Sequence, residues 1–323
     1  MPKQAISYDL RKYFNLTDLP MGPKSKTYLV DPVNGSDSNP GTNLEQPLLT
    51  LAAAEELCVA NQNDAVLIEG GPNPLNLTAN LAWDKSYTHL VGLTGNLPGV
   101  GQRARITSAT TAAILEMLTL AGSGCIFKNL NIQNECVADA DSGAMSITGM
   151  RNHLENVFIS GMISAVPAAK AAAYSLTVTG PENYFDRCAI GVSTIERTAH
   201  NAELILSGSN CKRNHFRKTQ FLSQSVDAGK VLVRIAAATE LWQLNFEECI
   251  WSNLAMNSGA GAGGTKIDHA IEDGATMYHQ IQLWGLNTAF GCTQFTAPAT
   301  YVFTHGAAVG GAVAPIALND LTT

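Results

Sequence analysis

The strongest constraint on this chain is a short segment that recurs four times at nearly constant spacing. The copies occupy residues 152–159, 183–190, 214–221 and 244–251. The aligned apolar position is held by Leu154, Phe185, Phe216 and Phe246. Successive copies therefore lie 31, 31 and 30 residues apart, and a weaker copy around Phe127 lies 27 residues earlier. A unit this short cannot bury its apolar face alone, so neighbouring units must stack on a shared core.

Each unit has the pattern of short strands. Within a copy, apolar residues recur around charged ones in runs too short for a helix, which predicts a β-strand. A second strand is expected before each copy, ending in Gly149, Gly180 or Gly208. Glycine permits the positive φ that a sharp corner requires. One unit is therefore predicted to contain a strand, a corner, a second strand and a longer loop of variable length.

A repeat of about 30 residues with several short strands suits a solenoid, in which each coil adds about 4.8 Å along the axis. We therefore predict an all-β fold, a right-handed parallel β-helix. A β-propeller is the alternative, but its blades repeat at about 40–45 residues and carry Trp-Asp or Gly-His signatures, which are absent from these copies.

The stretch before the repeats has a recognisable order. A strand-like segment begins at Thr27, a turn rich in Gly, Ser, Asp, Asn and Pro follows over residues 31–42, and a second strand-like segment begins at Asp64. Between them, apolar residues from Leu48 onward recur at helical spacing, which predicts a short capping helix over the open end of the first coil. This order resembles the opening of pectate-lyase-like β-helix proteins, and the resemblance implies the same fold.

These features divide the chain into four parts. They are an N-terminal attachment arm (residues 1–26), an entry strand, turn and capping helix (27–63), the parallel β-helix (64–305) and an Ala/Gly-rich C-terminal segment (306–323). The arm belongs to no coil, and we expect it to become ordered on a partner. Its predicted partner-binding residues are Leu10, Arg11, Tyr13, Phe14, Leu16 and Leu19. The alternative is that the arm folds back over its own solenoid.

Composition narrows the function classes. Charged residues make up only 15% of the chain, which favours area buried between subunits and therefore an oligomer. The net charge of −7 and the lack of a basic cluster argue against nucleic-acid binding. No stretch is apolar enough to span a membrane, and the first residues lack the apolar core of a secretion signal, so we expect synthesis and folding in a cytoplasm.

The cysteines predict neither disulfides nor a metal site. There are seven, an odd number without paired spacing. Cys188 and Cys249 hold equivalent repeat positions, so we expect them to stack inside the coil as small apolar residues.

One column of charge is the main candidate for chemistry. Charged residues follow the aligned apolar position in successive units, at Lys128, Glu155, Asp186, Arg217 and Glu247. Because the column contains both signs, these residues are expected to pair as a solvated ladder on one face. If the chain were an enzyme acting on acidic polysaccharide, the residues to test would be Glu155, Asp186, Arg217 and Glu247, since hydrolases and lyases need positioned carboxylates or a base.

The motifs of the enzymes in the resembled superfamily are absent. The strings Asn-Thr-Asp, Asp-Asp, Gly-His-Gly and Arg-Ile-Lys of polygalacturonase-type hydrolases do not occur, and no calcium-binding aspartate cluster of the pectate-lyase type is visible. His153 and His215 share a repeat position with Tyr184, which favours surface stacking over metal binding. We therefore assign no catalytic residue, no metal and no cofactor.

In organisation, the chain is similar to the β-helical structural proteins of tailed-phage particles: capsid decoration proteins, head fibres and tailspikes. This resemblance implies a non-enzymatic virion protein, most closely a homotrimeric capsid decoration or head-fibre protein. It would attach through residues 1–26 to the major capsid protein or another virion protein. The alternatives are a tailspike-type polysaccharide depolymerase, either a lyase or a glycoside hydrolase, and a glycan-binding module, each of which would meet a host surface polysaccharide.

Overall fold

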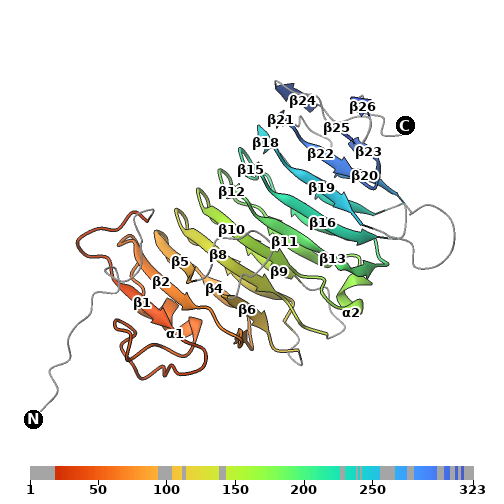
Figure 1. Cartoon of the computed structure of the whole chain (residues 1–323). Helices are drawn as coiled ribbons and strands as arrows, with labels where there is room; N and C mark the ends of the chain where they lie inside the picture. Colours follow the sequence, from red (N-terminus) through yellow and green to blue (C-terminus); the bar gives the residue numbers. More distant parts are fainter. Residues whose placement is uncertain are drawn as a thin grey trace, which may run out of the picture.

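The computed structural model describes residues 19–93, 104–110, 114–137, 143–225, 230–237, 239–240, 242–254, 266–274, 280–296, 302–305, 310–311 and 314–315. In these ranges the chain forms a rod of parallel strands stacked from the N-terminal to the C-terminal end (Figure 1). The prediction of an all-β parallel β-helix is confirmed. Every described strand pairing is parallel except the short β25–β26 pair near the C-terminus.

The strands belong to two sheets. The larger sheet has 18 strands in the described ranges. They are β1 (Thr27–Val30), β2 (Asp64–Glu69), β3 (Leu75–Leu77), β5 (Thr88–Leu93), β6 (Arg105–Ser108), β8 (Ile126–Gln133), β10 (His153–Ser160), β12 (Tyr184–Asp186), β13 (Ala189–Arg197), β15 (His215–Arg217), β16 (Gln220–Ser225), β18 (Leu244–Glu247), β19 (Ile250–Asn253), β21 (Ile281–Trp284), β22 (Thr288–Phe290), β24 (Val302–His305), β25 (Gly310–Gly311) and β26 (Ala314–Pro315).

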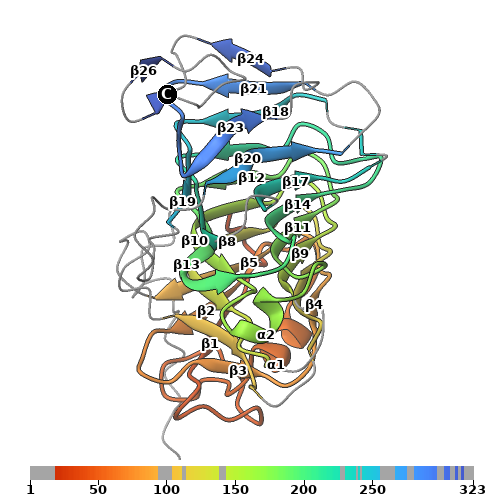
Figure 2. The ribbon, with the colours of Figure 1, turned by 90° about the vertical axis from the view of Figure 1, so that its right-hand side faces the viewer.

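The smaller sheet has eight strands in the described ranges, and Figure 2 shows several of them one above another. They are β4 (Leu81–Trp83), β7 (Glu116–Leu120), β9 (Gly143–Ile147), β11 (Tyr174–Val178), β14 (Ala202–Leu206), β17 (Val231–Ile235), β20 (Ile267–Asp273) and β23 (Cys292–Thr296).

Each central coil contributes one strand to the smaller sheet and two to the larger one, for example β11 followed by β12 and β13. The prediction of a single strand at residues 185–190 is therefore wrong, because this segment contains the end of β12 and the start of β13. The strand bends at Arg187, whose φ is 52°. The two strands of the larger sheet in one coil meet at this bend.

Left-handed backbone residues mark two corners of the coil. The corner within the larger sheet is held by Asn129, Asn156, Arg187, Lys218, Glu248 and Gly285, with φ between 48° and 65°. The corner between the two sheets is held by Gly124, Arg151, Glu182, Arg213 and Gln243, with φ between 53° and 68°. A non-glycine residue in this region is strained by about 1–3 kcal/mol, so the stacked strands on either side must enforce it.

The glycines predicted as corners serve a different purpose in two of three cases. Gly208 does have a positive φ, of 89°. Gly149 and Gly180 do not, and they are needed because consecutive coils approach closely at these positions. A Cβ atom at Gly149 would lie 2.0 Å from the carbonyl oxygen of Gly122, and one at Gly180 would lie 1.9 Å from that of Gly149.

The core is filled by residues that stack on themselves from coil to coil. Leu154, Phe185, Phe216 and Phe246 are paired in register and fully buried. The rings of Phe185 and Phe216 are stacked at 4.4 Å between centroids, and those of Phe216 and Phe246 at 5.3 Å. Because the repeat period brings like side chains together, aromatic stacking adds to the burial of apolar area along this column.

A column of buried asparagines joins the coils at the corner between the sheets. The side-chain oxygen of Asn152 accepts from the Cys125 N–H at 2.8 Å, that of Asn183 from the Asn152 N–H at 3.0 Å, and that of Asn214 from the Asn183 N–H at 2.9 Å. Backbone donors at these turns have no strand partner, so the side chains satisfy buried groups that would otherwise be unpaired.

The predicted capping helix is present as α1 (Leu51–Leu57), at the N-terminal end of the rod (Figure 1). Leu51 and Ala54 enter the core, and the Thr50 side chain accepts from the Ala53 N–H at 3.2 Å as the N-cap. At the other end of α1, the Lys85 ammonium donates to the carbonyl oxygen of Glu56 at 2.9 Å. A second short helix, α2 (Ala165–Ala168), contacts β13.

The cysteines are inside the coil, as predicted for Cys188 and Cys249. All seven are buried and none forms a disulfide. The thiol of Cys188 donates to the carbonyl oxygen of Leu154 at 3.4 Å, and that of Cys249 to Phe216 at 3.2 Å. Burial raises the pKa of both thiols to about 12, so they stay protonated and are poor nucleophiles.

Candidate functional site

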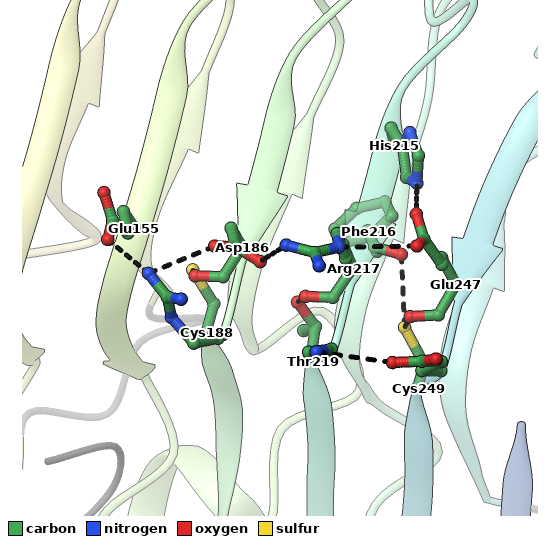
Figure 3. A network of polar contacts seen from close by, with 12 residues as sticks. Glu155, Asp186, Cys188, His215, Phe216, Arg217, Thr219, Glu247 and Cys249 are labelled. Carbon is green, nitrogen blue, oxygen red and sulfur yellow. Dashed lines mark hydrogen bonds and ion pairs between the residues drawn. The ribbon is translucent and has the colours of Figure 1, made fainter. Parts of the chain in front are cut away.

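The predicted column of charge forms on the outward face of the larger sheet. Glu155 lies in register with Lys128 on one side and Asp186 on the other, and Asp186, Arg217 and Glu247 continue the column. Each of these five residues directly follows a buried residue of the core. Because successive side chains of a strand point to opposite faces, all five face away from the core. Figure 3 shows Glu155, Asp186, Arg217 and Glu247 in line across successive strands. We call these five residues, with Arg187, the outward ladder.

The ladder is held together by ion pairs. The Lys128 Nζ atom lies 3.0 Å from Glu155 Oε2, and Arg187 Nη2 lies 3.2 Å from Asp186 Oδ2 and also contacts Glu155. Arg217 bridges the next two coils, with Nη1 at 3.2 Å from Asp186 Oδ1 and Nε at 3.4 Å from Glu247 Oε1. Each of the three carboxylates therefore has at least one cationic partner.

Sequence reasoning missed Arg187 because its position looked like the middle of a strand. In the structure it is the corner residue, and the left-handed backbone places its guanidinium against Glu155 and Asp186. The signal that could have revealed it is the repetition of polar residues at the same position, namely Asn129, Asn156, Lys218 and Glu248.

The ladder is partly withdrawn from water at its centre. The Asp186 side chain is 9% exposed and Glu155 is 15% exposed, whereas Arg217 and Glu247 are each 33% exposed. The pKa of Arg217 is raised, chiefly by the nearby Asp186 carboxylate. Attraction of this kind keeps the guanidinium charged and favours the paired geometry over a free one.

A second column runs beside the ladder and contains rings. His153, Tyr184 and His215 are in register. The Tyr184 ring meets His153 edge to face at 5.2 Å and His215 at 4.9 Å between centroids. Burial lowers the pKa of both histidines, which favours neutral imidazoles. The rings at this repeat position therefore contact one another, as edge-to-face neighbours that are partly buried and not as a face-to-face surface stack.

The ladder ends in an aromatic residue. Trp284 follows Glu247 in the register, and its ring stacks on His305 at 4.0 Å between centroids. Its Nε1–H donates to the Asn245 side chain at 3.3 Å, and 41% of the residue is exposed. This placement could not be predicted from the repeat, because Trp284 lies 37 positions after Glu247, outside the regular period.

The predicted attachment arm is only partly within the described residues. Leu19 is buried against its own chain, in a cluster with Leu29, Ala65, Leu67 and Val91 on the outer face of β1, β2 and β5. The Lys26 N–H donates to the buried Asp64 carboxylate at 2.6 Å. The last residues of the arm therefore lie on their own solenoid. Leu10, Arg11, Tyr13, Phe14 and Leu16 lie outside the described residues, and their partner-binding role stays a prediction.

Two further classes of site are absent from the described part of the chain. No group of three or more His, Cys, Asp or Glu residues there is arranged to hold a metal ion. No helix within the described ranges is long and apolar enough to cross a membrane.

Comparison with known proteins gives a likeness of fold. No protein-family model and no curated protein sequence matches the chain. Pectin methylesterase PemA from Erwinia chrysanthemi superposes with a TM-score of 0.59 and 14% identity over 92% of both chains. A pectin methylesterase mutant in complex with a hexasaccharide gives 0.59 and 15% over the same shares. The enzyme from Aspergillus niger gives 0.52 and 13% over 91% of this chain and 88% of that one.

Proposed function

We propose that this chain, a right-handed parallel β-helix with the pectate-lyase-like fold, is a non-enzymatic structural protein of a tailed-phage particle, such as a capsid decoration or head-fibre protein. The observation that carries the proposal is the pairing of the outward ladder, in which Glu155, Asp186 and Glu247 all contact cations. Hydrolysis of a glycosidic bond needs one carboxyl group held protonated opposite an ionised one. Opposite charges that pair along a rod instead tie one coil to the next.

The attachment role is supported by residue types at the N-terminal end. Residues 1–18 include Leu10, Tyr13, Phe14 and Leu16, which a solvated tail would not need. The low charge of the whole chain, 15%, supports burial of further surface between subunits, so we propose a homotrimer. The partner in this proposal is the major capsid protein or another virion protein, and the location is the virion.

A turnover assay tests the non-enzymatic half. Purified protein is incubated with acidic and neutral polysaccharides, including methyl-esterified polygalacturonate, and methanol, new reducing ends and unsaturated uronates are measured. We expect none of the three products from a well-folded sample. Turnover that is lost in Asp186→Asn and kept in Asp268→Asn, an exposed aspartate on β20, would overturn the proposal and make the ladder an active site.

An attachment assay tests the structural half. Full-length protein and a chain without residues 1–18 are mixed with phage particles that lack the protein, and co-sedimentation is measured. We expect only the full-length chain to sediment with particles, while both chains fold and unfold cooperatively on heating. Equal binding of the two would contradict attachment through the arm. Analytical ultracentrifugation tests the trimer, since one chain has a mass of 34.2 kDa.

A glycan-binding or glycan-cleaving protein is the second candidate, and the position of Trp284 favours it. The exposed indole stands at the end of the ladder, where an aromatic face can stack on a sugar ring. The resembling pectin methylesterases act on pectin, as their names state, and one of them holds a hexasaccharide. Oligogalacturonate binding, followed by intrinsic fluorescence, would be lost in Trp284→Ala. Trp242→Ala, which removes the other exposed tryptophan, is the matched control.

A further inference from the structure

The first coil leaves two strand edges without a described partner strand. Among the described strands, β3 pairs only with β6, and β4 pairs only with β7. In the middle of the rod a strand lies between two neighbours, as β11 does between β9 and β14. A free strand edge carries a row of backbone N–H and C=O groups that can pair with another extended segment. This end of the molecule therefore offers backbone groups to such a segment.

A groove runs along this edge. A hollow of about 360 Å³ lies between the start of α1 and the segment from β3 to β4, and Leu49 and Leu75 are in its lining. A second hollow of about 520 Å³ shares residues 78–80 with the first and continues to Leu115 and Glu116. Leu49 is 38% exposed and Leu115 is 58% exposed. Leu49 thus lies at the side of the unpaired edge, and Leu115 lies one coil further on, beside β7, across residues 78–80.

One carboxylate stands at the far end of the groove. The Tyr174 hydroxyl donates to Glu116 Oε2 at 3.0 Å, and the Thr119 hydroxyl donates to Glu116 Oε1. The Asn80 amide donates to Thr119 Oγ1 at 3.0 Å and holds that hydroxyl in place. No described Lys, Arg or His lies within ion-pair distance of Glu116, in contrast with the carboxylates of the outward ladder. A fixed carboxylate beside apolar side chains fits a segment that carries a cation among apolar residues.

The chain contains a segment with this chemistry. Residues 1–18 lie outside the described residues, and they place Arg11 and Lys12 between Leu10, Tyr13 and Phe14. The described chain starts at Leu19 on the outer face of β1, β2 and β5, at the same end of the rod as the groove. An extended segment of this length spans up to about 60 Å, which is enough to pass round one coil. A tethered segment also has a high effective concentration near its anchor.

We propose that residues 1–18 dock in their own chain's groove, along the free edge of β3 and β4, with a basic side chain of the segment on Glu116. In the free protein this docking covers apolar side chains of the arm and of the groove together. The same side chains are those assigned to particle attachment, so docking and attachment exclude each other. The mutual exclusion of docking and attachment rests on the proposed function, whereas the docking does not.

Limited trypsin digestion of the full-length chain tests the docking, because trypsin cleaves after Arg11 and Lys12. A docked segment is cleaved slowly. We expect the double variant Leu49→Asp, Leu115→Asp to be cleaved there at least about tenfold faster, since both side chains are exposed and the changes weaken docking while leaving the fold. Leu286→Asp, 61% exposed at the opposite end of the rod, is the matched control and should change nothing. Equal cleavage of all three proteins would overturn the proposal.

Zero-length carbodiimide cross-linking locates the segment. An amide between Lys12 and Glu116, found by mass spectrometry in a species of single-chain mass and absent in Glu116→Gln, is the expected result. The same amide joining two chains would overturn docking in cis and assign the groove to a second copy. If the wild-type chain gives no more of this amide than Glu116→Gln does, the contact between the basic side chain and Glu116 would be overturned. If docking holds and particle attachment fails, only the proposed function is lost.

Discussion

Lys218 is a corner residue whose backbone conformation is unusual for a lysine. Its φ of 48° lies in the left-handed region, while its N–H donates to the carbonyl oxygen of Glu247 at 2.7 Å and its neighbours Arg217 and Thr219 sit in fixed columns. The corner therefore sets the backbone conformation of Lys218 independently of its side chain. The energetic cost of this conformation is offset by the pairing of the strands on both sides. The side chain itself is half exposed, in a pair with Glu248 at 3.5 Å.

We expect Lys218→Val to lower the free energy of unfolding by about 1–3 kcal/mol, because a β-branched residue fits the left-handed region poorly. Lys218→Asn removes the same exposed charge but tolerates this backbone, so it should lie within about 0.5 kcal/mol of the parent chain. Urea unfolding of the three proteins measures the difference. Equal losses in both variants would mean that the ion pair, and not the corner, sets the effect.

His89 makes the stability depend on pH. It is fully buried, its Nδ1 accepts from the Ile126 N–H at 3.1 Å, and burial lowers its pKa from 6.5 to about 4. The folded state therefore prefers the neutral ring, and this stabilisation is present above pH 6.5 and is lost as pH falls toward 4. Between pH 7 and pH 5 we expect a loss of up to about 2 kcal/mol from this group.

His89→Asn checks this, because it keeps an acceptor near the Ile126 N–H but does not titrate. The variant should be less stable at pH 7 and should lose less stability than the parent between pH 7 and pH 5, as followed by urea unfolding. His200→Asn is the control, since His200 is 49% exposed at its side chain. A parent and a His89→Asn variant with the same pH slope would show that the ring does not control it.

At the scale of the element, the coils are joined by side chains as well as by strands. Asn183 has both parts of its amide engaged, since its oxygen accepts from Asn152 and its nitrogen donates to the carbonyl oxygens of Gly149 and Gly180 at 3.2 and 3.1 Å. The same carbonyl of Gly149 forbids a side chain at Gly180. In the coils of Asn152 and Asn183, one asparagine and one glycine thus specify the turn.

Asn183→Leu should lower the free energy of unfolding by about 2–4 kcal/mol, because it leaves the Asn152 N–H and the Gly149 carbonyl oxygen buried without their partner, while the Gly180 carbonyl still accepts from Asn214. Asn210→Leu, at an exposed turn position in the next coil, should change it by less than about 0.5 kcal/mol. Thermal and urea unfolding of both variants would measure this. A small effect at Asn183 would mean that water or a shifted backbone replaces the amide.

The elements that sequence could predict are those in which a side chain repeats. Phe185, Phe216 and Phe246 stack in register, so their spacing revealed the coil and the column of charge that follows it. Arg187 and Lys218 could not be recognised as corners, because their conformation is imposed by stacked neighbours and runs against their own preference. Asn152, Asn183 and Asn214 did carry a signal, the same 31-residue spacing, but their partners are backbone groups, which a sequence does not display.

For the whole molecule, the two ends of the rod pose the main problem, since a stack of coils would otherwise expose its core. At the N-terminal end, α1 places Leu51 and Ala54 on the core. Its start is fixed by Thr50, whose hydroxyl donates to the Asp37 carboxylate at 2.9 Å. The cap thereby blocks an apolar cross-section that would favour end-to-end association.

Thr50→Ala removes the N-cap and should make local opening of α1 easier by about 1 kcal/mol, which is roughly a fivefold faster hydrogen exchange in residues 51–57. Thr42→Ala, at an exposed position of the same loop, is the control and should leave exchange unchanged. Self-association on sedimentation should rise in Thr50→Ala alone. Unchanged exchange in both variants would show that core packing holds the helix without its cap.

The matched register of the central coils also has an evolutionary consequence. In β10, β12, β15 and β18, the paired residues lie one repeat apart, so a coil can be lost without changing the register of these strands. Deleting residues 184–214 would place Leu154 against Phe216, an apolar pair as now, and Glu155 against Arg217, an opposite-charge pair in place of Glu155 and Asp186. Tandem duplication or deletion of one repeat can therefore lengthen or shorten the rod in steps of about 4.8 Å, the spacing of neighbouring strands.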